Sequence, residues 1–201
     1  MKKTTKTAML LAATMATVLL SGCGAKKEEA APASTEETPY AVITVKNYGT
    51  IKVKLDPSEA PLTVQNFIKL AESGFYDGLT FHRIMDGFMI QGGDPDGNGT
   101  GGADTNIKGE FASNGVDNHI SHKRGVISMA RSQFPDSASS QFFIVQSDST
   151  FLDGEYAGFG YVTEGIEVVD QICADAQPVD DNGTIPADAQ PVMESIKITY
   201  E

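Results

Sequence analysis

The pattern of apolar and polar positions after residue 39 begins with two short β-type runs. Ile51-Lys52-Val53-Lys54-Leu55 alternates strictly, as a strand with one buried face does, and Ala41-Val42-Ile43-Thr44-Val45 is rich in β-branched residues. Asn47-Tyr48-Gly49 between these runs has the composition of a tight turn. The pattern therefore predicts a β-hairpin at the start of the folded region.

Two later segments have the period of amphipathic helices instead. The first is predicted over residues 61–73, which begin at a proline and are followed by Gly74, a typical helix stop. Its apolar positions at i, i+3, i+4 and i+7 are Val64, Phe67, Ile68 and Ala71. The second helix is predicted over residues 166–174, with Ile166, Val169 and Cys173 on one face.

Six further β-type runs complete the predicted elements, at residues 80–85, 88–91, 125–130, 141–146, 157–162 and 196–200. Eight strands, closely spaced turns and only two helices favour a mainly β fold, a closed antiparallel barrel or a sandwich, over a parallel α/β sheet. Residues 175–192 have no regular period and contain the string Asp-Ala-Gln-Pro-Val twice. This segment is predicted to be a long acidic loop of unassigned function.

The first 22 residues have the composition of an export signal. Three lysines precede an uncharged stretch over residues 7–20, which is too short to span a bilayer comfortably. The stretch ends in Leu20-Ser21-Gly22-Cys23, which resembles the lipobox of bacterial lipoproteins. The resemblance implies a signal peptide at residues 1–22 and a lipid on Cys23; the alternative is a secretory peptide followed by an unmodified thiol. With a diacyl group on Cys23, we expect an extracytoplasmic protein anchored to the bacterial cell membrane.

The folded domain is predicted to begin at Tyr40. Residues 23–39 contain no aromatic side chain and are expected to form a solvated tether, whereas all 16 aromatic residues stand at or after Tyr40. This places the domain at residues 40–201. Cys173 has no disulfide partner once Cys23 is lipidated, and it is predicted to be buried.

The charge of the chain excludes one class of partner. The chain has 15 basic and 27 acidic residues. Removal of residues 1–22 takes away three lysines and no acidic residue, so 12 basic and 27 acidic residues remain and the net charge is −15. Such a field repels a polyanionic backbone, so nucleic-acid binding is not expected.

Two short motifs in the glycine-rich segment 92–102 imitate ligand sites. Residues 97–102 match the dinucleotide pattern G-x-G-x-x-G, but no strand-to-helix turn is predicted around them. Asp94, Asp96 and Asn98 imitate the front of an EF-hand calcium loop, but position twelve is Thr105 where that loop needs glutamate. A glycine-rich surface loop is the preferred interpretation, and calcium-dependent binding is the alternative.

Other groups capable of catalysis lack suitable surroundings. His119 and His122 have no third ligand at a useful spacing and are predicted to be a surface pair, so we expect no metal site. Residues 137–140 lack the G-x-S-x-G elbow of serine hydrolases. Nucleophilic catalysis therefore has no support in the sequence.

Three longer strings are more specific: FHRIMDGFMIQGGD at residues 81–94, GVISMAR at 125–131 and SSQFFI at 139–144. With Phe151-Leu152-Asp153-Gly154 and Phe159-Gly160, they strongly resemble the cyclophilin family of peptidyl-prolyl cis-trans isomerases, in order and across essentially all of residues 40–201. The resemblance implies a closed eight-stranded antiparallel barrel with two helices. It also implies an isomerase that acts on proline-containing polypeptides and needs no cofactor.

The resemblance also implies a set of site residues. In the family, the residue that matches Arg83 donates hydrogen bonds around the prolyl bond, and Phe88 and Gln91 are assigned to catalysis with it. The residues expected to bind substrate are Met89, Gly102, Ala130, Arg131, Gln141, Phe143, Phe151, Leu152 and Tyr156. Strand alternation agrees, because it puts Met89 with Gln91, and Gln141 with Phe143, on one face. The alternative for the apolar members of this set is a place in the barrel core.

Three positions depart from well-known eukaryotic cyclophilins, which have Trp, His and Asn where this chain has Phe151, Tyr156 and Arg131. Phe151 has no indole N–H, so tight cyclosporin binding is affected more than catalysis. The sequence as a whole predicts a monomeric, lipid-anchored isomerase that assists the folding of exported proteins. A non-catalytic peptide-binding module that uses the same groove is the rival hypothesis.

Overall fold

A computed structural model describes residues 37–201, so the predicted signal peptide and Cys23 lie outside the described residues. Eight strands and two α-helices follow one another as β1 (Pro39–Val45), β2 (Gly49–Leu55), α1 (Pro61–Glu72), β3 (Thr80–Met85), β4 (Met89–Asp94), β5 (Val126–Met129), β6 (Phe142–Val145), β7 (Gly158–Glu164), α2 (Ile166–Asp175) and β8 (Met193–Tyr200). Short 3₁₀ helices at Ala112–Asn114 and Thr150–Leu152 were not predicted. The mainly β class and the predicted elements are confirmed, with ends that shift by up to three residues.

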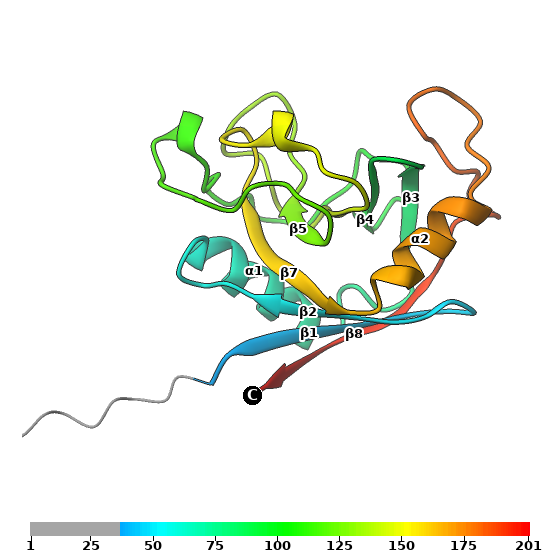
Figure 1. Cartoon of the computed structure of the whole chain (residues 1–201), viewed down its shortest axis with the longest axis horizontal. Coiled ribbons are helices and arrows are strands. Elements are labelled where there is room, and N and C mark those ends of the chain that lie inside the picture. Colours follow the sequence, from blue (N-terminus) through cyan, green and yellow to red (C-terminus); the bar gives the residue numbers. More distant parts are fainter. Residues whose placement is uncertain (1–36) are drawn as a thin grey trace, which may run out of the picture. The chain divides into compact units, whose positions relative to one another are not determined.

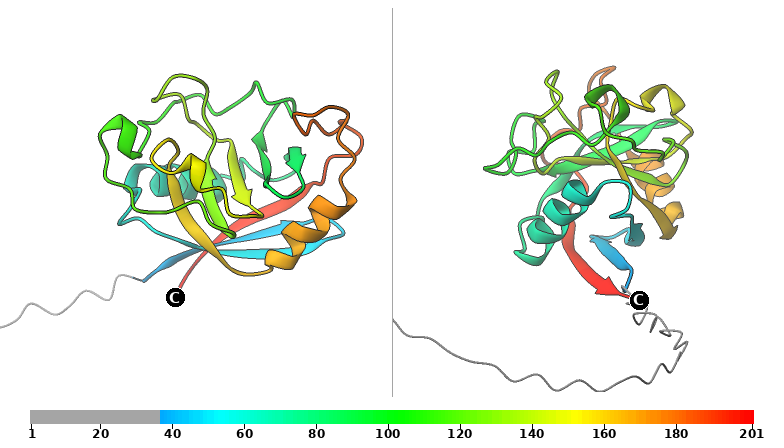
Figure 2. Two further views of the ribbon diagram at one scale, coloured as in Figure 1. Left: turned by 45° about the horizontal axis from the view of Figure 1, so that its top comes forward. Right: turned by 90° about the vertical axis from the view of Figure 1, so that its left-hand side faces the viewer.

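All eight strands belong to one antiparallel sheet, in the order β3-β4-β6-β5-β7-β2-β1-β8. The sheet curves into an open half-barrel, so the prediction of a closed barrel is wrong (Figures 1 and 2). The edge strands β3 and β8 share no ladder. The segments around their ends are joined by an isolated bridge of Thr80 with Val192 and by backbone hydrogen bonds from Phe81 N–H to the Pro191 carbonyl (2.9 Å) and from Met193 N–H to the Leu79 carbonyl (2.8 Å).

The outer edge of β3 is covered by the loop between α2 and β8 rather than by a strand. Ile84 N–H donates to the Gly183 carbonyl (2.8 Å), and Ile185 N–H donates to the His82 carbonyl (3.0 Å). This loop contains Pro186 and Pro191, which have no N–H to donate to a ladder. Residues 176–192 therefore form the predicted long loop, and they satisfy the strand edge without closing the barrel.

The two helices cover different parts of the sheet (Figure 1). Helix α1 buries Phe67 against Tyr76, Phe142 and Phe159, with ring centroids 5.2, 5.5 and 5.2 Å apart. Helix α2 buries Val169 and Cys173 as predicted, and burial raises the pKa of the Cys173 thiol to about 12. Neither helix in residues 37–201 is long and apolar enough to cross a membrane.

A buried carboxylate from a distant loop caps helix α1. Ala60, which precedes the helix, makes no side-chain cap. Glu110, which is 3% exposed, accepts hydrogen bonds from the N–H groups of Leu62 (3.0 Å) and Thr63 (2.7 Å) and from the Thr63 hydroxyl (2.7 Å). The negative charge also lies at the positive end of the helix dipole, which stabilises both.

Candidate active site

Nine of the twelve predicted site residues line one cavity of about 150 Å³ on the sheet face that turns away from the aromatic core. They are Arg83, Phe88, Met89, Gln91, Ala130, Arg131, Phe143, Leu152 and Tyr156. Strand register explains the convergence, because Gln91 of β4 lies opposite Arg83 of β3 on one side and opposite Phe143 of β6 on the other. The hairpin of β3 and β4 and the distant strand β6 thus bring these residues together across three neighbouring strands.

Arg83 is half-buried and is held by neutral groups. Its Nε donates to the Asn182 carbonyl (2.7 Å), and one terminal nitrogen donates to Gln91 Oε1 (3.2 Å). Burial lowers the pKa of this guanidinium, while Tyr156 and Asp180 act in the opposite direction. The group has no salt-bridge partner within residues 37–201. A guanidinium remains charged at any ordinary pH, so a fixed cation faces the cavity.

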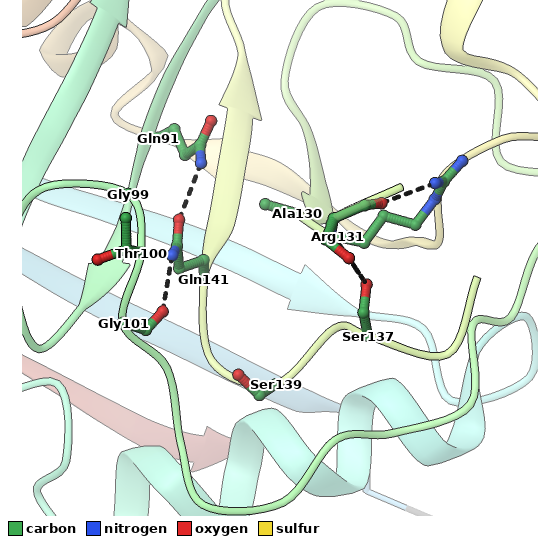
Figure 3. Close-up of a pocket in the computed structure, with 10 residues that line it drawn as sticks. Gln91, Gly99, Thr100, Gly101, Ala130, Arg131, Ser137, Ser139 and Gln141 are labelled. Carbon is green, nitrogen blue, oxygen red and sulfur yellow. Dashed lines mark hydrogen bonds between the residues drawn. The ribbon is translucent and has the colours of Figure 1, made fainter. Parts of the chain in front are cut away.

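A chain of amides extends from Arg83 into a neighbouring cavity of about 190 Å³, and Figure 3 shows the residues that line this second cavity. Gln91 Nε2 donates to Gln141 Oε1 (2.9 Å), and Gln141 Nε2 donates to the Gly101 carbonyl (2.8 Å). Gln141 lines this second cavity rather than the first. Gly102 lines neither cavity; it packs against the Ser139 hydroxyl, which leaves no room for a Cβ.

Aromatic rings form the apolar side of the first cavity. Phe143 is 5% exposed and packs edge-on against Tyr156, with ring centroids 5.8 Å apart. Phe151 does not line the cavity: it is 73% exposed and packs on Phe88 from outside, at 5.6 Å. Met89 and Phe143 belong to a hydrophobic cluster that is separate from the main core around Phe67. The apolar residues of the predicted site are therefore not part of the barrel core.

Arg131 joins the two cavities. Its guanidinium lies between the rings of Phe111 (5.0 Å) and Tyr156 (4.7 Å), and its Nε donates to the Glu155 carbonyl (2.9 Å). Both cavities include Arg131 in their lining. The cation thus fixes the ring of Tyr156, which belongs to the apolar wall.

The prediction of a surface histidine pair is correct for His119 and wrong for His122. His119 is exposed and its Nδ1 lies 3.1 Å from Glu59. The His122 side chain is fully buried: Nδ1 lies 3.0 Å from Asp153 Oδ1, Nε2 lies 3.0 Å from Ser128 Oγ, and the ring stacks on Phe143. The spacing of His119 and His122 does not predict this burial, because it depends on Ser128 of β5 and on Asp153, which is 31 residues away.

The Asp153, His122 and Ser128 side chains are linked by hydrogen bonds in the same order as the triad of a serine hydrolase, but the serine is not accessible to a substrate. Ser128 is fully buried in β5, so its hydroxyl does not reach a substrate. Burial lowers the pKa of His122, against the opposing effect of Asp153. Sequence reasoning also missed Asn182, which holds Arg83 through a backbone carbonyl, an interaction that no side-chain motif reveals.

The glycine-rich segment forms the predicted loop. Asp94 at its start is 1% exposed and accepts hydrogen bonds from the N–H groups of Asp96, Asn98 and Gly99. Both carboxylate oxygens are thereby used in shaping the turn. Within residues 37–201, no three His, Cys, Asp or Glu side chains converge in an arrangement that could hold a metal ion.

Comparison with known proteins agrees with this geometry. Residues 40–199 match the family described as cyclophilin type peptidyl-prolyl cis-trans isomerase/CLD. A peptidyl-prolyl cis-trans isomerase of Helicobacter pylori is 46% identical over 149 residues, which cover 73% of this chain and 85% of that one. Peptidyl-prolyl cis-trans isomerase B of Bacillus subtilis is 50% identical over 117 residues, 58% of this chain and 78% of that one.

A solved structure shows the same fold. The crystal structure of a Cryptosporidium parvum cyclophilin type isomerase, in the presence of the dipeptide Ala-Pro, has 32% sequence identity and a TM-score of 0.70. The match covers 81% of this chain and 99% of that one. With the strand order, the cavity and these relatives in agreement, the chain belongs to the cyclophilin-type peptidyl-prolyl cis-trans isomerases.

Proposed function

We propose that this isomerase catalyses rotation about X-Pro bonds in the cavity between Arg83 and Phe143, and that its substrates are exported polypeptides outside the cytoplasm. Family membership establishes the reaction. The proposal adds the residues that carry the reaction, the class of client and the lipid anchor on Cys23. The observation that carries the assignment of these residues is a half-buried guanidinium, without an acidic partner in the described residues, beside an apolar cavity. The class of client and the anchor are supported by the export-signal composition of residues 1–22 and by the string Leu20-Ser21-Gly22-Cys23.

The cavity suits a proline ring on one side and the rotating amide on the other. Rotation about an X-Pro bond breaks amide resonance, with a barrier of about 18–20 kcal/mol, and makes or breaks no covalent bond. The ring binds against Met89, Phe143 and Leu152, while Arg83 donates hydrogen bonds to the substrate next to the bond that turns. As resonance is lost, the amide nitrogen becomes a better acceptor, so a fixed cation favours the twisted state.

Magnitudes show that Arg83 does not act alone. Shortening a reaction of tens of seconds to about a millisecond requires roughly 10⁴-fold acceleration, or about 5.5 kcal/mol. A hydrogen bond from a charged donor contributes about 1.5–3 kcal/mol. The remainder comes from holding the ring in the apolar cavity and from removing water around the amide.

Gln91 has the role of positioning Arg83 and the substrate chain. Its side chain accepts from Arg83 and donates to Gln141, so the guanidinium and the second cavity are connected by one line of hydrogen bonds. Ala130 contributes through its backbone, which donates to the Gln141 carbonyl (2.9 Å) and fixes the strand edge beside the cavity. The crystal structure of the Cryptosporidium parvum relative was determined in the presence of the dipeptide Ala-Pro, which supports an X-Pro peptide as the ligand here.

Replacement of Arg83 by alanine tests the proposal. We expect kcat/KM for a short X-Pro peptide, measured by NMR exchange, to fall by about 10²-fold, because the cation is lost while the apolar cavity remains. Arg124→Ala is the control, since Arg124 pairs with Asp170 away from the cavity and its loss should leave the rate within about twofold.

Two outcomes would contradict the proposal. An Arg83→Ala protein as active as the wild type would remove Arg83 from the mechanism. Peptide binding by the wild type without any acceleration would instead favour the non-catalytic binding module.

A further inference from the structure

A third cavity, of about 400 Å³, adjoins the proposed active site at Arg83 and Gln91. Its other walls come from the glycine-rich loop, with Asn98 and Thr100, and from the loop before β8, with Asn182 and Thr184. Its buried member is His82 of β3. The cavity is polar on every side, in contrast to the apolar walls proposed to hold proline.

The register of β3 explains why His82 faces this cavity. Phe81 pairs with Gly92 and Arg83 pairs with Gln91, so His82 is the extra residue of a β-bulge. The bulge turns Phe81 into the core and Arg83 toward the proposed active site. His82 is then left between them, at the floor of the polar cavity.

His82 is 4% exposed, and neither ring nitrogen has a hydrogen-bond partner among residues 37–201. Its acidic neighbour Asp94 is fully occupied by the N–H groups of its own turn. Burial lowers the pKa of His82, an effect that Arg83 reinforces and Asp94 opposes, so the ring is neutral near pH 7. A neutral imidazole presents one donor and one acceptor, and leaving both unused in a buried place is unfavourable.

The walls of this cavity are fixed before anything binds. The Asp180 carboxylate accepts from the N–H groups of Asn182 (3.1 Å) and Thr184 (3.0 Å). Gly99 has a φ of +90° and no side chain; a Cβ there would lie 3.7 Å from His82 Nε2 and would partly cover the ring. The glycine therefore keeps the imidazole open to the cavity.

The geometry points to a second substrate subsite in this cavity, one that takes the carboxamide side chain of an Asn or Gln near the proline. This inference rests on the proposed function, because the substrate chain would pass Arg83 from one cavity to the other. A carboxamide offers one acceptor and a pair of donors, which complement the neutral ring of His82. Arg83 disfavours a cationic side chain here, and Asp94 and Asp180 disfavour an anionic one.

Extended peptide advances about 3.3–3.6 Å per residue, so residues within three positions of proline can reach the subsite. The test uses peptides of equal shape in which each such position, on either side of proline, carries Asn or Leu. We expect the wild type to prefer Asn about tenfold in kcat/KM at one position, mainly through KM. In His82→Leu the ratio should fall to about one, whereas His119→Leu, at an exposed histidine, should keep the wild-type ratio.

A spectroscopic measurement keeps the test independent of folding in the variant. Adding the preferred Asn peptide to the wild-type protein should shift the ¹⁵N resonances of the His82 imidazole, and the Leu peptide should not. No Asn preference at any position, an undiminished preference in His82→Leu, or unchanged His82 resonances would overturn the subsite. Failure to isomerise every peptide would contradict the proposed function instead, and the titration would still decide whether the subsite exists.

Discussion

One imidazole, that of His122, contacts Phe143, which lines the proposed proline-binding cavity, and two residues that do not line it, Ser128 and Asp153. Its ring stacks on Phe143, its Nε2 reaches Ser128 in β5, and its Nδ1 reaches Asp153, the neighbour of Leu152. The Asp153 carboxylate also accepts from the His122 N–H (2.7 Å). A neutral ring satisfies both partners when Nδ1 carries the proton and Nε2 accepts from the hydroxyl.

This arrangement predicts that acid destabilises the folded protein through His122. Its pKa is lowered by burial below the usual 6.5, so below pH 6.5 the unfolded chain binds a proton that the folded chain does not. The free energy of unfolding should therefore decrease as the pH falls from about 7.5 to 5. Although burial opposes it, hydrogen bonds from His122 and Ser121 keep the pKa of Asp153 below its ordinary value, so this carboxylate stays ionised in that window.

Urea denaturation at several pH values measures the effect. His122→Gln, which does not titrate, should lose less stability on acidification than the wild type. Because His82 has a lowered pKa as well, part of the pH dependence should remain. A wild-type slope in His122→Gln would contradict the prediction.

At the scale of elements, helix α1 depends on a cap from outside the helix. The N–H groups at its start are bound by Glu110, about fifty residues away, and this carboxylate is 3% exposed. Glu110→Gln keeps the shape but removes the charge and one acceptor. We expect the free energy of unfolding to fall by about 1–3 kcal/mol in urea denaturation.

The matched control for this cap is Glu72→Gln at the exposed end of the same helix, which should change stability by less than about 0.5 kcal/mol. Equal effects of the two substitutions would show that the hydrogen bonds of Glu110 do not stabilise the helix start.

The helices and strands also show which features of the fold can be predicted from the sequence. Period and turn composition located the strands and helices, because those signals are local: β3 spans 80–85 as predicted. Closure of the barrel was predicted wrongly because it depends on whether β8 or a proline-containing loop reaches the edge of β3. The positions of Arg83, Gln91 and Phe143 followed from long strings, whereas the roles of His82, His122 and Asn182 depend on a bulge and on contacts between distant segments.

At the scale of the whole molecule, the folded domain keeps its N-terminal end beside its C-terminal end. Thr38 and Glu201 exchange two backbone hydrogen bonds (2.8 and 3.1 Å), next to the pairing of β1 with β8. Figure 2 shows this end of the sheet away from the loops that surround the cavities. The first and last residues of the described chain therefore lie together on the side of the sheet away from those loops.

The proposed anchor gives a prediction for the complete protein. In bacterial cells supplied with an alkyne-labelled fatty acid, the wild type should incorporate the label and sediment with membranes, because two acyl chains on Cys23 hold a protein stably. Cys23→Ser should lose the label and appear in the soluble fraction. Cys173→Ser is the matched control, since that thiol is 3% exposed and its pKa is raised to about 12, which makes it a poor nucleophile. Label that survives in Cys23→Ser, or that disappears in Cys173→Ser, would contradict anchoring at Cys23.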